Sequence, residues 1–352
     1  MFYYDYKLKY NIFTNFIYLY KDNLTLSVNM TNTDSDFLPW VEKYRPKSIN
    51  EIISHAQNIE TIKKLLIGGS LPHLLFHGAS GTGKTSTIMA LSKEIYGNNV
   101  RLMVMKLDAS DDRGINSVRE DIKGFAEKSN MFQKGVRLII LDEADSMTFD
   151  AQFALRRIIE KYSATIRFCL ICNYENKIIP AIRSRCANFR FSNIDNIHIC
   201  NKLNQIIKEE KLKHEPDVTN TIATLAKGDL RKAINLLQSI SMQTNYITNI
   251  ICYETAGIPS KTEVKEILNT LLDESKSFDF SYKKIGKLIK SQGYSLSIVL
   301  KEIILELLSE KLSDNMPQII SDLSDLENMV TKSTFGDIYI TSLVGIFKKN
   351  IK

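Results

Sequence analysis

The chain has 352 residues, 44% hydrophobic and 24% charged, with a formal net charge of +6. This composition is typical of globular proteins and excludes a chain that is disordered throughout. The mild basic excess is compatible with nucleic-acid binding but does not demonstrate it, and the length predicts two or three domains.

Residues 1–36 differ from the remainder of the chain. The first twenty are rich in Phe and Tyr but are interrupted by charged residues, so no apolar run reaches the ~18 residues of a membrane helix. Lys7 and Lys9 precede an apolar stretch as in a signal peptide, although a small-residue cleavage site is not evident. We interpret 1–36 as a disordered extension, or as a start codon assigned too early.

A phosphate-binding loop is the strongest motif. Residues 73–77 predict a short buried strand and 85–91 a helix, and the segment between them fits G-x-x-x-x-G-K-[ST]. Its backbone N–H groups would wrap phosphate oxygens at a helix N-terminus. Strand and helix together disfavour the alternative, a chance glycine-rich turn. The candidate nucleotide-binding residues here are Gly78, Ala79, Ser80, Gly81, Thr82, Gly83, Lys84, Thr85 and Ser86.

Two carboxylates follow the apolar run 137–142, which predicts a strand buried on both faces. Asp142 would hold Mg²⁺ through water, together with the Thr85 hydroxyl. Glu143 would polarise the attacking water as general base, and Lys84 would reach the β- and γ-phosphates. The alternative is a strand that ends in solvated acids, which the upstream loop disfavours.

Further strands are expected at 102–107, 167–172 and 187–191, which makes residues 37–195 an alternating α/β pattern. The second of these strands contains Cys169 and Cys172. Five cysteines without framework spacing favour reduced thiols inside a cell. We interpret Cys169 and Cys172 as core residues rather than metal or redox ligands.

Three polar residues outside the two motifs are candidates with open alternatives. Asn173, at the end of the 167–172 strand, could orient the lytic water or touch the γ-phosphate, or simply form a turn. Arg185 is either a surface residue or an arginine finger. Arg231 opens a helix of the next domain, from which it could close over the nucleotide.

The pattern becomes helical from about 196 and stays helical from 258 onward. Ser260 and Glu263 form a capping box. A wide apolar face follows at helical spacing, and it indicates either the domain's own core or an oligomer interface. Its members are Leu296, Val299, Leu300, Ile303, Ile304, Leu307 and Leu308.

Taken together, these motifs resemble the clamp-loader branch of the AAA+ ATPases, and most closely the small subunits of replication factor C. The matching stretches are LPWVEKYRP at 38–46, the 78–85 loop, ASDDRGI at 109–115, LDEAD at 141–145, ALRR at 154–157, CNY at 172–174, SRC at 184–186 and GDLR at 228–231. The resemblance covers about 38 to 257 and continues weakly beyond. Residues 53–55 and 168–174 are typical of one particular small subunit.

The resemblance implies an α/β P-loop AAA+ core at 37–195, a helical lid domain at 196–257 and an all-α collar or oligomerisation domain at 258–352. Five such subunits would form an open spiral that uses ATP and Mg²⁺ to open a sliding clamp (PCNA) and place it on primer–template DNA in the nucleus. Val41 and Arg45 would lie at the adenine pocket, and Asn173 and Arg231 would be nucleotide sensors.

By the same resemblance, Arg185 would act in trans on the γ-phosphate of the neighbouring subunit. Arg113 and Arg119 would touch DNA phosphates without reading bases, whereas composition alone favours solvated surface for both.

Three departures from the family pattern stand out, and one is the N-terminal extension 1–36, which has no counterpart. The loop begins Gly-Ala-Ser-Gly instead of Gly-Pro-Pro-Gly, at positions that vary. Asp108 replaces the usual Asn, and proximity to Glu143 would raise the pKa of one carboxyl and alter basal turnover. Two other functions compete: a structural nucleotide-binding subunit without useful turnover, and an AAA+ helicase motor of the branch-migration type, which predicts a C-terminal DNA-binding domain.

Overall fold

The computed structural model describes residues 38–67, 71–110, 114–127, 136–309, 316–332 and 336–350. The segment 1–36, interpreted above as an extension, lies outside the described residues. The chain divides into two units, 1–45 and 46–352. The described part of the first unit holds one short helix, α2 (Trp40–Lys43). Just after it, the Arg45 guanidinium pairs with the Glu42 carboxylate at 3.1 Å.

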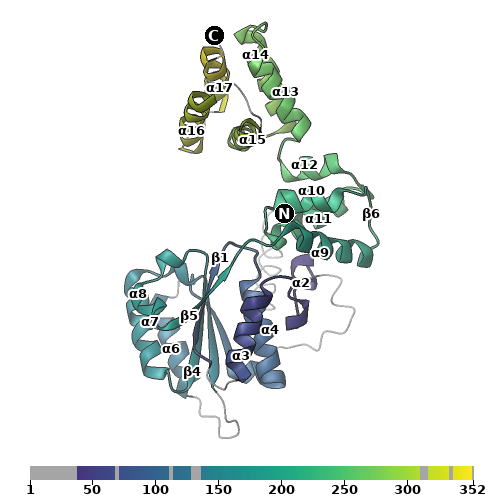
Figure 1. Ribbon diagram of the computed structural model, residues 1–352. Coiled ribbons are helices and arrows are strands. Elements are labelled where there is room, and N and C mark those ends of the chain that lie inside the picture. The colour runs from purple at the N-terminus through teal and green to yellow at the C-terminus, as the bar shows by residue number, and fades with distance from the viewer. Residues whose placement is uncertain are drawn as a thin grey trace, which may run out of the picture. The chain divides into compact units, whose positions relative to one another are not determined.

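A five-stranded parallel sheet forms the centre of the α/β domain (Figure 1). Its order is β2-β3-β4-β1-β5, and the middle strands are buried apolar runs because helices cover both faces. The strands are β1 (His73–Gly78), β2 (Val104–Asp108), β3 (Arg137–Asp142), β4 (Ile166–Cys172) and β5 (Cys186–Phe191). Four of the expected strands lie within a residue of these bounds. The second starts at 104 rather than 102, because α5 (Val100–Met103) occupies the preceding residues.

Helices α3 (Ala56–Ile67) and α4 (Lys84–Tyr96) cover one face of the sheet. Helices α6 (Gly114–Glu127), α7 (Phe149–Tyr162) and α8 (Pro180–Arg183) cover the other (Figure 1). Short 3₁₀ turns connect several elements: η2 (Ile49–Glu51), η3 (Gly97–Asn99), η4 (Ala144–Ser146) and η5 (Glu175–Lys177). The result is a three-layer α/β/α domain whose strand ends carry the motif residues.

The cysteines of β4 are core residues, as predicted. Cys169 and Cys172 are both buried in the sheet. Burial raises the pKa of the Cys169 thiol well above its ordinary value and that of Cys172 to about 12. Both thiols therefore stay protonated and pack as small apolar groups.

The next domain is helical with one exception. It consists of α9 (Asn196–Glu209), α10 (Val218–Ala226), α11 (Leu230–Gln243) and α12 (Asn249–Ala256). Two-residue strands, β6 (Lys213–His214) and β7 (Tyr246–Ile247), form a small parallel pair within it. The purely helical expectation missed this pair, because two residues are too few to show a periodicity.

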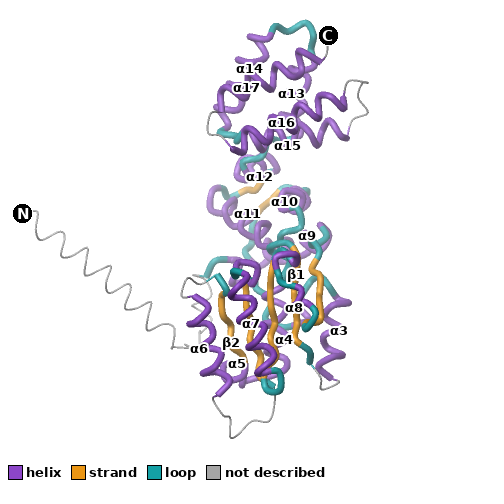
Figure 2. Tube along the Cα trace, turned by 90° about the vertical axis from the view of Figure 1, so that its left-hand side faces the viewer, coloured by secondary structure: helices purple, strands orange, loops and turns teal. Residues whose placement is uncertain are grey.

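The C-terminal part of the chain is all helical (Figure 2). It contains α13 (Lys261–Leu272), α14 (Phe278–Gln292), α15 (Leu296–Ser309), α16 (Met316–Lys332) and α17 (Gly336–Asn350). The predicted capping box is present, with Ser260 and Glu263 bonded reciprocally. Most of the predicted apolar face on α15 packs into the shared core of these helices, but Leu308 is exposed, so the expected face is too wide at that end.

Among the described residues, no helix combines the length and apolarity needed to cross a lipid bilayer.

Candidate active site

The phosphate loop lies between β1 and α4, in the strand–loop–helix setting that the motif requires. Gly78 has φ +145°, and an added Cβ would lie 2.0 Å from the Phe191 carbonyl oxygen of the neighbouring strand. Only glycine lets the chain leave the sheet here. Gly83 then caps α4, whose N-terminal N–H groups and dipole favour an anion.

Lys84 is buried at the first position of α4. Its ammonium donates to the carbonyl oxygens of Gly78 (2.8 Å) and Ala79 (2.7 Å) and to Asn173 Oδ1 (3.1 Å). Burial lowers the pKa of Lys84 from its ordinary value, and the positive charge of Arg231 adds to the lowering. The structure therefore brings the loop lysine and the end of β4 together.

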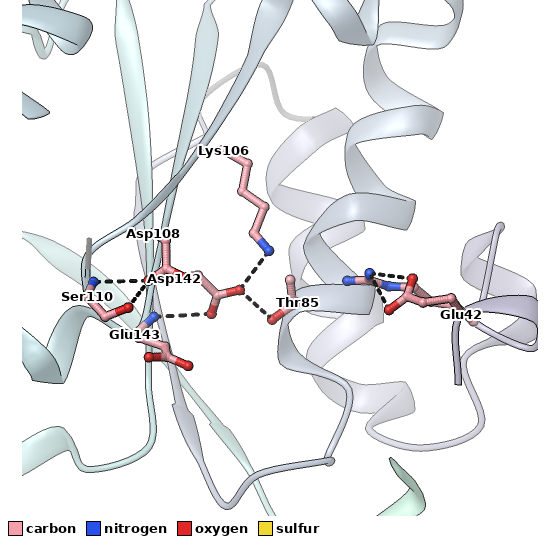
Figure 3. A network of polar contacts seen from close by, with 8 residues as sticks. Glu42, Thr85, Lys106, Asp108, Ser110, Asp142 and Glu143 are labelled. Atoms are coloured by element: carbon pink, nitrogen blue, oxygen red, sulfur yellow. Dashed lines mark hydrogen bonds and ion pairs between the residues drawn. The ribbon is translucent and has the colours of Figure 1, made fainter. Parts of the chain in front are cut away.

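The carboxylate of Asp142, at the end of β3, is the second centre of the site (Figure 3). Its Oδ2 accepts from Thr85 Oγ1 at 3.1 Å and pairs with the Lys106 ammonium at 3.1 Å. Its Oδ1 accepts from the Glu143 backbone N–H at 3.2 Å. The two side chains predicted to hold Mg²⁺ are thus in direct contact, while Lys106 is a partner that the sequence analysis did not single out.

Glu143 follows Asp142 in a left-handed conformation, with φ +53°. This region is uncommon for a residue other than glycine and is frequent at functional sites. The Asp142 carboxylate points toward Thr85 and Lys106, whereas the Glu143 carboxylate points in a different direction (Figure 3). Glu143 itself is exposed.

Asp145 links β3 to β4. Its Oδ2 accepts from the backbone N–H groups of Asn173 and Tyr174, both at 3.2 Å. One carboxylate oxygen therefore fixes the backbone that presents the Asn173 amide to Lys84. Asp145 belongs to the LDEAD motif, but the sequence analysis gave it no role.

Gln152 of α7 holds together the segments that follow β3 and β4. Its buried amide donates to the carbonyl oxygens of Met147 (3.2 Å) and Lys177 (2.9 Å) and accepts from the Ile179 N–H (2.8 Å). These bonds satisfy buried polar groups on the segments that follow β3 and β4.

Arg185 follows α8 and is partly exposed. Its guanidinium pairs with Glu160 of α7 at 2.6 Å and donates to the Ala181 carbonyl at 2.6 Å. Arg156 also binds Glu160, and its hydrogen bond is the main reason that the pKa of Glu160 is lowered. Within this chain Arg185 does not join Lys84, Asp142 and Asn173; the pairing with Glu160 holds it at a different position.

Asp229 connects the phosphate loop to the helical domain. Its carboxylate caps α11 by accepting from Lys232 N–H (3.0 Å) and also accepts from Ser80 Oγ (3.0 Å). The Leu230 N–H donates to the Gly81 carbonyl at 3.3 Å. Arg231, the predicted sensor, is exposed on the first turn of α11.

The remaining predicted residues are not brought to this site by the described structure. Arg113 lies outside the described residues, and Arg119 is described only as backbone of α6. Val41 and Arg45 belong to the first unit. Asp108 lies opposite Asp142 in the register rather than Glu143, and its Oδ1 accepts from the Ser110 N–H and hydroxyl. An effect of Asp108 on turnover stays a prediction.

Four residues in or beside the site were missed: Lys106, Asp145, Gln152 and Asp229. The acidic ones had a signal, since both stand inside quoted motifs, LDEAD and GDLR. Lys106 had none, because its role depends on β2 being the neighbour of β3.

A glycine loop that opens a helix, joined by polar contacts to a carboxylate and an amide at the carboxyl edge of a parallel sheet, defines a P-loop nucleotide-binding protein. Three family descriptions match the chain in succession. Residues 74–194 match the "ATPase family associated with various cellular activities (AAA)", 201–242 the "RCF1/5-like, AAA+ ATPase lid domain", and 259–345 the "Replication factor C C-terminal domain".

Curated relatives agree with these matches. A "Probable replication factor C subunit 5" of Dictyostelium discoideum is 44% identical over 88% of this chain and 90% of its own length. Human replication factor C subunit 5 is 41% identical over 88% of this chain and 92% of its own length. Replication factor C subunit 3 of Saccharomyces cerevisiae is 37% identical over 93% and 98%. The chain belongs to the replication factor C family of AAA+ clamp-loader ATPases, and its enzymatic activity is ATP hydrolysis.

The likeness to subunit 5 in the human naming, indicated by residues 53–55 and 168–174, is consistent with these relatives. The RuvB branch-migration motor of Thermotoga maritima aligns over 75% of this chain and 91% of its own length, at 17% identity and a TM-score of 0.49. The C-terminal residues match the replication factor C domain instead of the DNA-binding domain that the motor hypothesis predicts.

Proposed function

We propose that this chain is an ATP-hydrolysing subunit of a heteropentameric clamp loader. It would couple ATP binding and hydrolysis to opening a ring-shaped sliding clamp (PCNA) and placing it on primer–template DNA in the nucleus. One observation carries the catalytic part of the proposal: Lys84 contacts Asn173 while Thr85 contacts Asp142. These contacts join the phosphate loop to the ends of β3 and β4, where ATPase chemistry requires its polar groups.

The residues around Asp142 fit a magnesium ion. Mg²⁺ prefers hard oxygen ligands and keeps several waters, usually binding through one or two protein groups plus substrate phosphates. The Thr85 hydroxyl and the Asp142 carboxylate, 3.1 Å apart, supply such a donor pair. Thr85 would ligate the ion and Asp142 would accept from its bound water. When bound, the ion would neutralise charge that develops on the β- and γ-phosphates.

The other residues divide the chemistry among them. The loop N–H groups of 78–86 and Lys84 would bind the phosphates. Glu143 would orient and deprotonate the attacking water, and Asn173 would contact the γ-phosphate or that water. Arg231 of the lid domain would act as a nucleotide sensor, while Val41 and Arg45 would line the adenine pocket.

Arg185 is the residue that we assign to a neighbouring subunit's site. An arginine finger stabilises transition-state charge and is supplied in cis or in trans. Glu160 neutralises the guanidinium at 2.6 Å, away from the chain's own Asp142 and Lys84. Release from Glu160 toward a neighbour's γ-phosphate is compatible with its partial exposure.

The partners of the assembly follow from the same family relation. Four related subunits would complete the ring through their C-terminal helical domains. Arg113 and Arg119 would contact DNA phosphates, so their loss would weaken binding equally across sequences and reduce its salt dependence.

Two variants test the proposal, with ATP binding measured on the isolated full-length chain and hydrolysis measured in the reconstituted pentamer. Lys84→Ala should abolish ATP binding at this subunit's own site, as measured by nucleotide binding to the isolated full-length chain. Arg185→Ala should leave that binding unchanged but slow hydrolysis at the adjacent subunit by about a thousandfold. Exposed Lys287→Ala in the helical C-terminus is the control.

The outcomes separate the parts of the proposal. Equal losses of binding and hydrolysis for both variants would refute the assignment of Arg185 to the neighbouring site. Co-purification with four related ATPases and a clamp supports the assembly, whereas a self-assembled hexamer contradicts it. Full clamp loading by the Lys84→Ala pentamer would indicate a structural subunit without useful turnover.

A further inference from the structure

Lys106 lies on β2, the edge strand next to β3. The register pairs Lys106 with Ile140 and Asp108 with Asp142. Residues two apart on a strand share a face, so Lys106 and Asp142 are diagonal neighbours on the same face of the sheet. A long side chain spans that diagonal, and Figure 3 shows the ammonium of Lys106 pointing at the Asp142 carboxylate beside Thr85.

Lys106 contacts the same oxygen of Asp142 that accepts the hydrogen bond from Thr85. Asp142 Oδ2 receives both the Lys106 ammonium and the Thr85 hydroxyl at 3.1 Å, while Oδ1 receives the Glu143 N–H at 3.2 Å. A carboxylate oxygen has about two acceptor positions. Thr85 and Lys106 therefore fill Oδ2, and a further donor to this oxygen has to displace one of them.

Thr85 and Lys106 differ in whether a metal ion displaces them. A hydroxyl has one donor hydrogen and two lone pairs, so Thr85 can ligate Mg²⁺ while it continues to donate to Asp142. Lys106 has only donors. A magnesium-bound water would therefore compete with the Lys106 ammonium for the same position on Oδ2.

We propose that Lys106 is a positioning residue that holds the Asp142 carboxylate beside Thr85 and weakens the binding of divalent metal at this site. The inference rests on the proposed function, since it concerns the same nucleotide site. Metal binding moves the Lys106 ammonium off Oδ2 into solvent, which its side chain, 44% exposed, already reaches. The charge of Lys106 also opposes the ion directly.

The test measures metal affinity rather than turnover. Full-length chain saturated with a non-hydrolysable ATP analogue is titrated with Mn²⁺, and free Mn²⁺ is followed by electron paramagnetic resonance. Lys106→Gln, which keeps the length but removes the charge, should tighten Mn²⁺ binding by about two- to fivefold, the scale of a partly exposed ion pair. Lys106→Arg should retain the parent affinity.

Lys284→Gln is the matched control, because Lys284 of α14 pairs with Glu266 at 2.7 Å, its side chain is 40% exposed and neither residue belongs to the α/β domain. Unchanged or weaker Mn²⁺ binding in Lys106→Gln overturns the inference, provided that the parent binds nucleotide and metal. Tighter binding of the analogue itself to Lys106→Gln in EDTA also overturns it, since Lys106 would then oppose the nucleotide. Failure of the parent to bind the analogue overturns the proposed function as well.

Discussion

The C-terminal helices and the phosphate-loop edge of the sheet are ordered by different forces. The helices α13–α17 share one apolar core, in which side chains such as Val299, Leu343 and Phe347 are fully buried. The site instead depends on polar atoms from distant parts of the sequence, with Lys84 bonded to Asn173 and Ser80 to Asp229. An apolar core tolerates exchange of shape at constant volume, whereas a polar network requires particular atoms. Substitutions in the two regions should therefore fail in different ways.

The largest effect is expected in the helical region. Phe347→Ala removes a fully buried ring from α17 and should lower the free energy of unfolding by about 3–5 kcal/mol. Nucleotide affinity should be unchanged, because the loss is one of packing. Denaturant unfolding and analogue binding on the full chain measure both quantities. Ile338→Ala, at an exposed position of the same helix, is the control. A parallel loss of nucleotide affinity would contradict the separation of the two regions.

A pair of glycines with nearly equal φ sharpens the comparison. Gly81 (φ +66°) would place a Cβ 1.7 Å from Asp229 Oδ1, whereas Gly293 (φ +68°) at the end of α14 has nothing within 4 Å. Gly293→Ala should cost about 1 kcal/mol of conformational strain. Gly81→Ala adds displacement of the α11 cap, so about 2–3 kcal/mol is expected. Equal losses in thermal unfolding would show that Asp229 moves away freely.

Asp145→Ala tests whether β4 is positioned by a carboxylate. Loss of an acceptor shared by the Asn173 and Tyr174 N–H groups should shift the Asn173 amide and slow ATP hydrolysis in the pentamer by about tenfold, or ~1.4 kcal/mol. Binding of ATP should change little. Asp145→Asn keeps an acceptor oxygen and should recover part of the rate, and Asp150→Asn, exposed on α7, is the control. A full rate in Asp145→Ala would remove the positioning role.

The smallest effect concerns pH. His73 Nδ1 accepts from the Phe168 N–H, and burial, reinforced by Arg167, lowers the pKa of His73 to about 4. The neutral form is therefore favoured on folding, and its contribution is complete above pH 6.5 and is lost as the pH falls toward 4. Partial exposure limits the contribution to about 1 kcal/mol. Unfolding of His73→Gln should depend less on pH in that interval, and parallel profiles would contradict this role.

Local signals made much of the fold predictable. The apolar runs at 73–77 and 137–142 are strands buried on both faces, and the glycine motif fixes where β1 ends and α4 begins. The contact between Thr85 and Asp142 also followed from motif chemistry. These features depend on residues close in the sequence or on one well-defined chemical requirement.

Features that depend on the neighbour of a strand were not predictable. The sequence raised the approach of Asp108 to Glu143 as a condition, and the register that bears on it, with Asp108 opposite Asp142, is visible only in the structure. Lys106 gained a role only because β2 lies beside β3. The expected apolar face of α15 included Leu308, which is exposed because the other helices cover only part of that face. Sequence spacing gives the direction of a side chain, but tertiary packing decides whether anything meets it.

The Gln152 amide bears on how fast the site can respond. All three of its partners belong to the chain itself, so the segments after β3 and β4 lose their conformational entropy during folding and not during ligand binding. We therefore expect motion during the ATPase cycle to involve groups that this anchor does not hold, namely the helical domain that begins at α9 and carries Arg231 on α11, and the partly exposed Arg185. Gln152 therefore keeps this edge of the sheet rigid. Conformational changes in the assembly would then take place relative to a fixed catalytic edge.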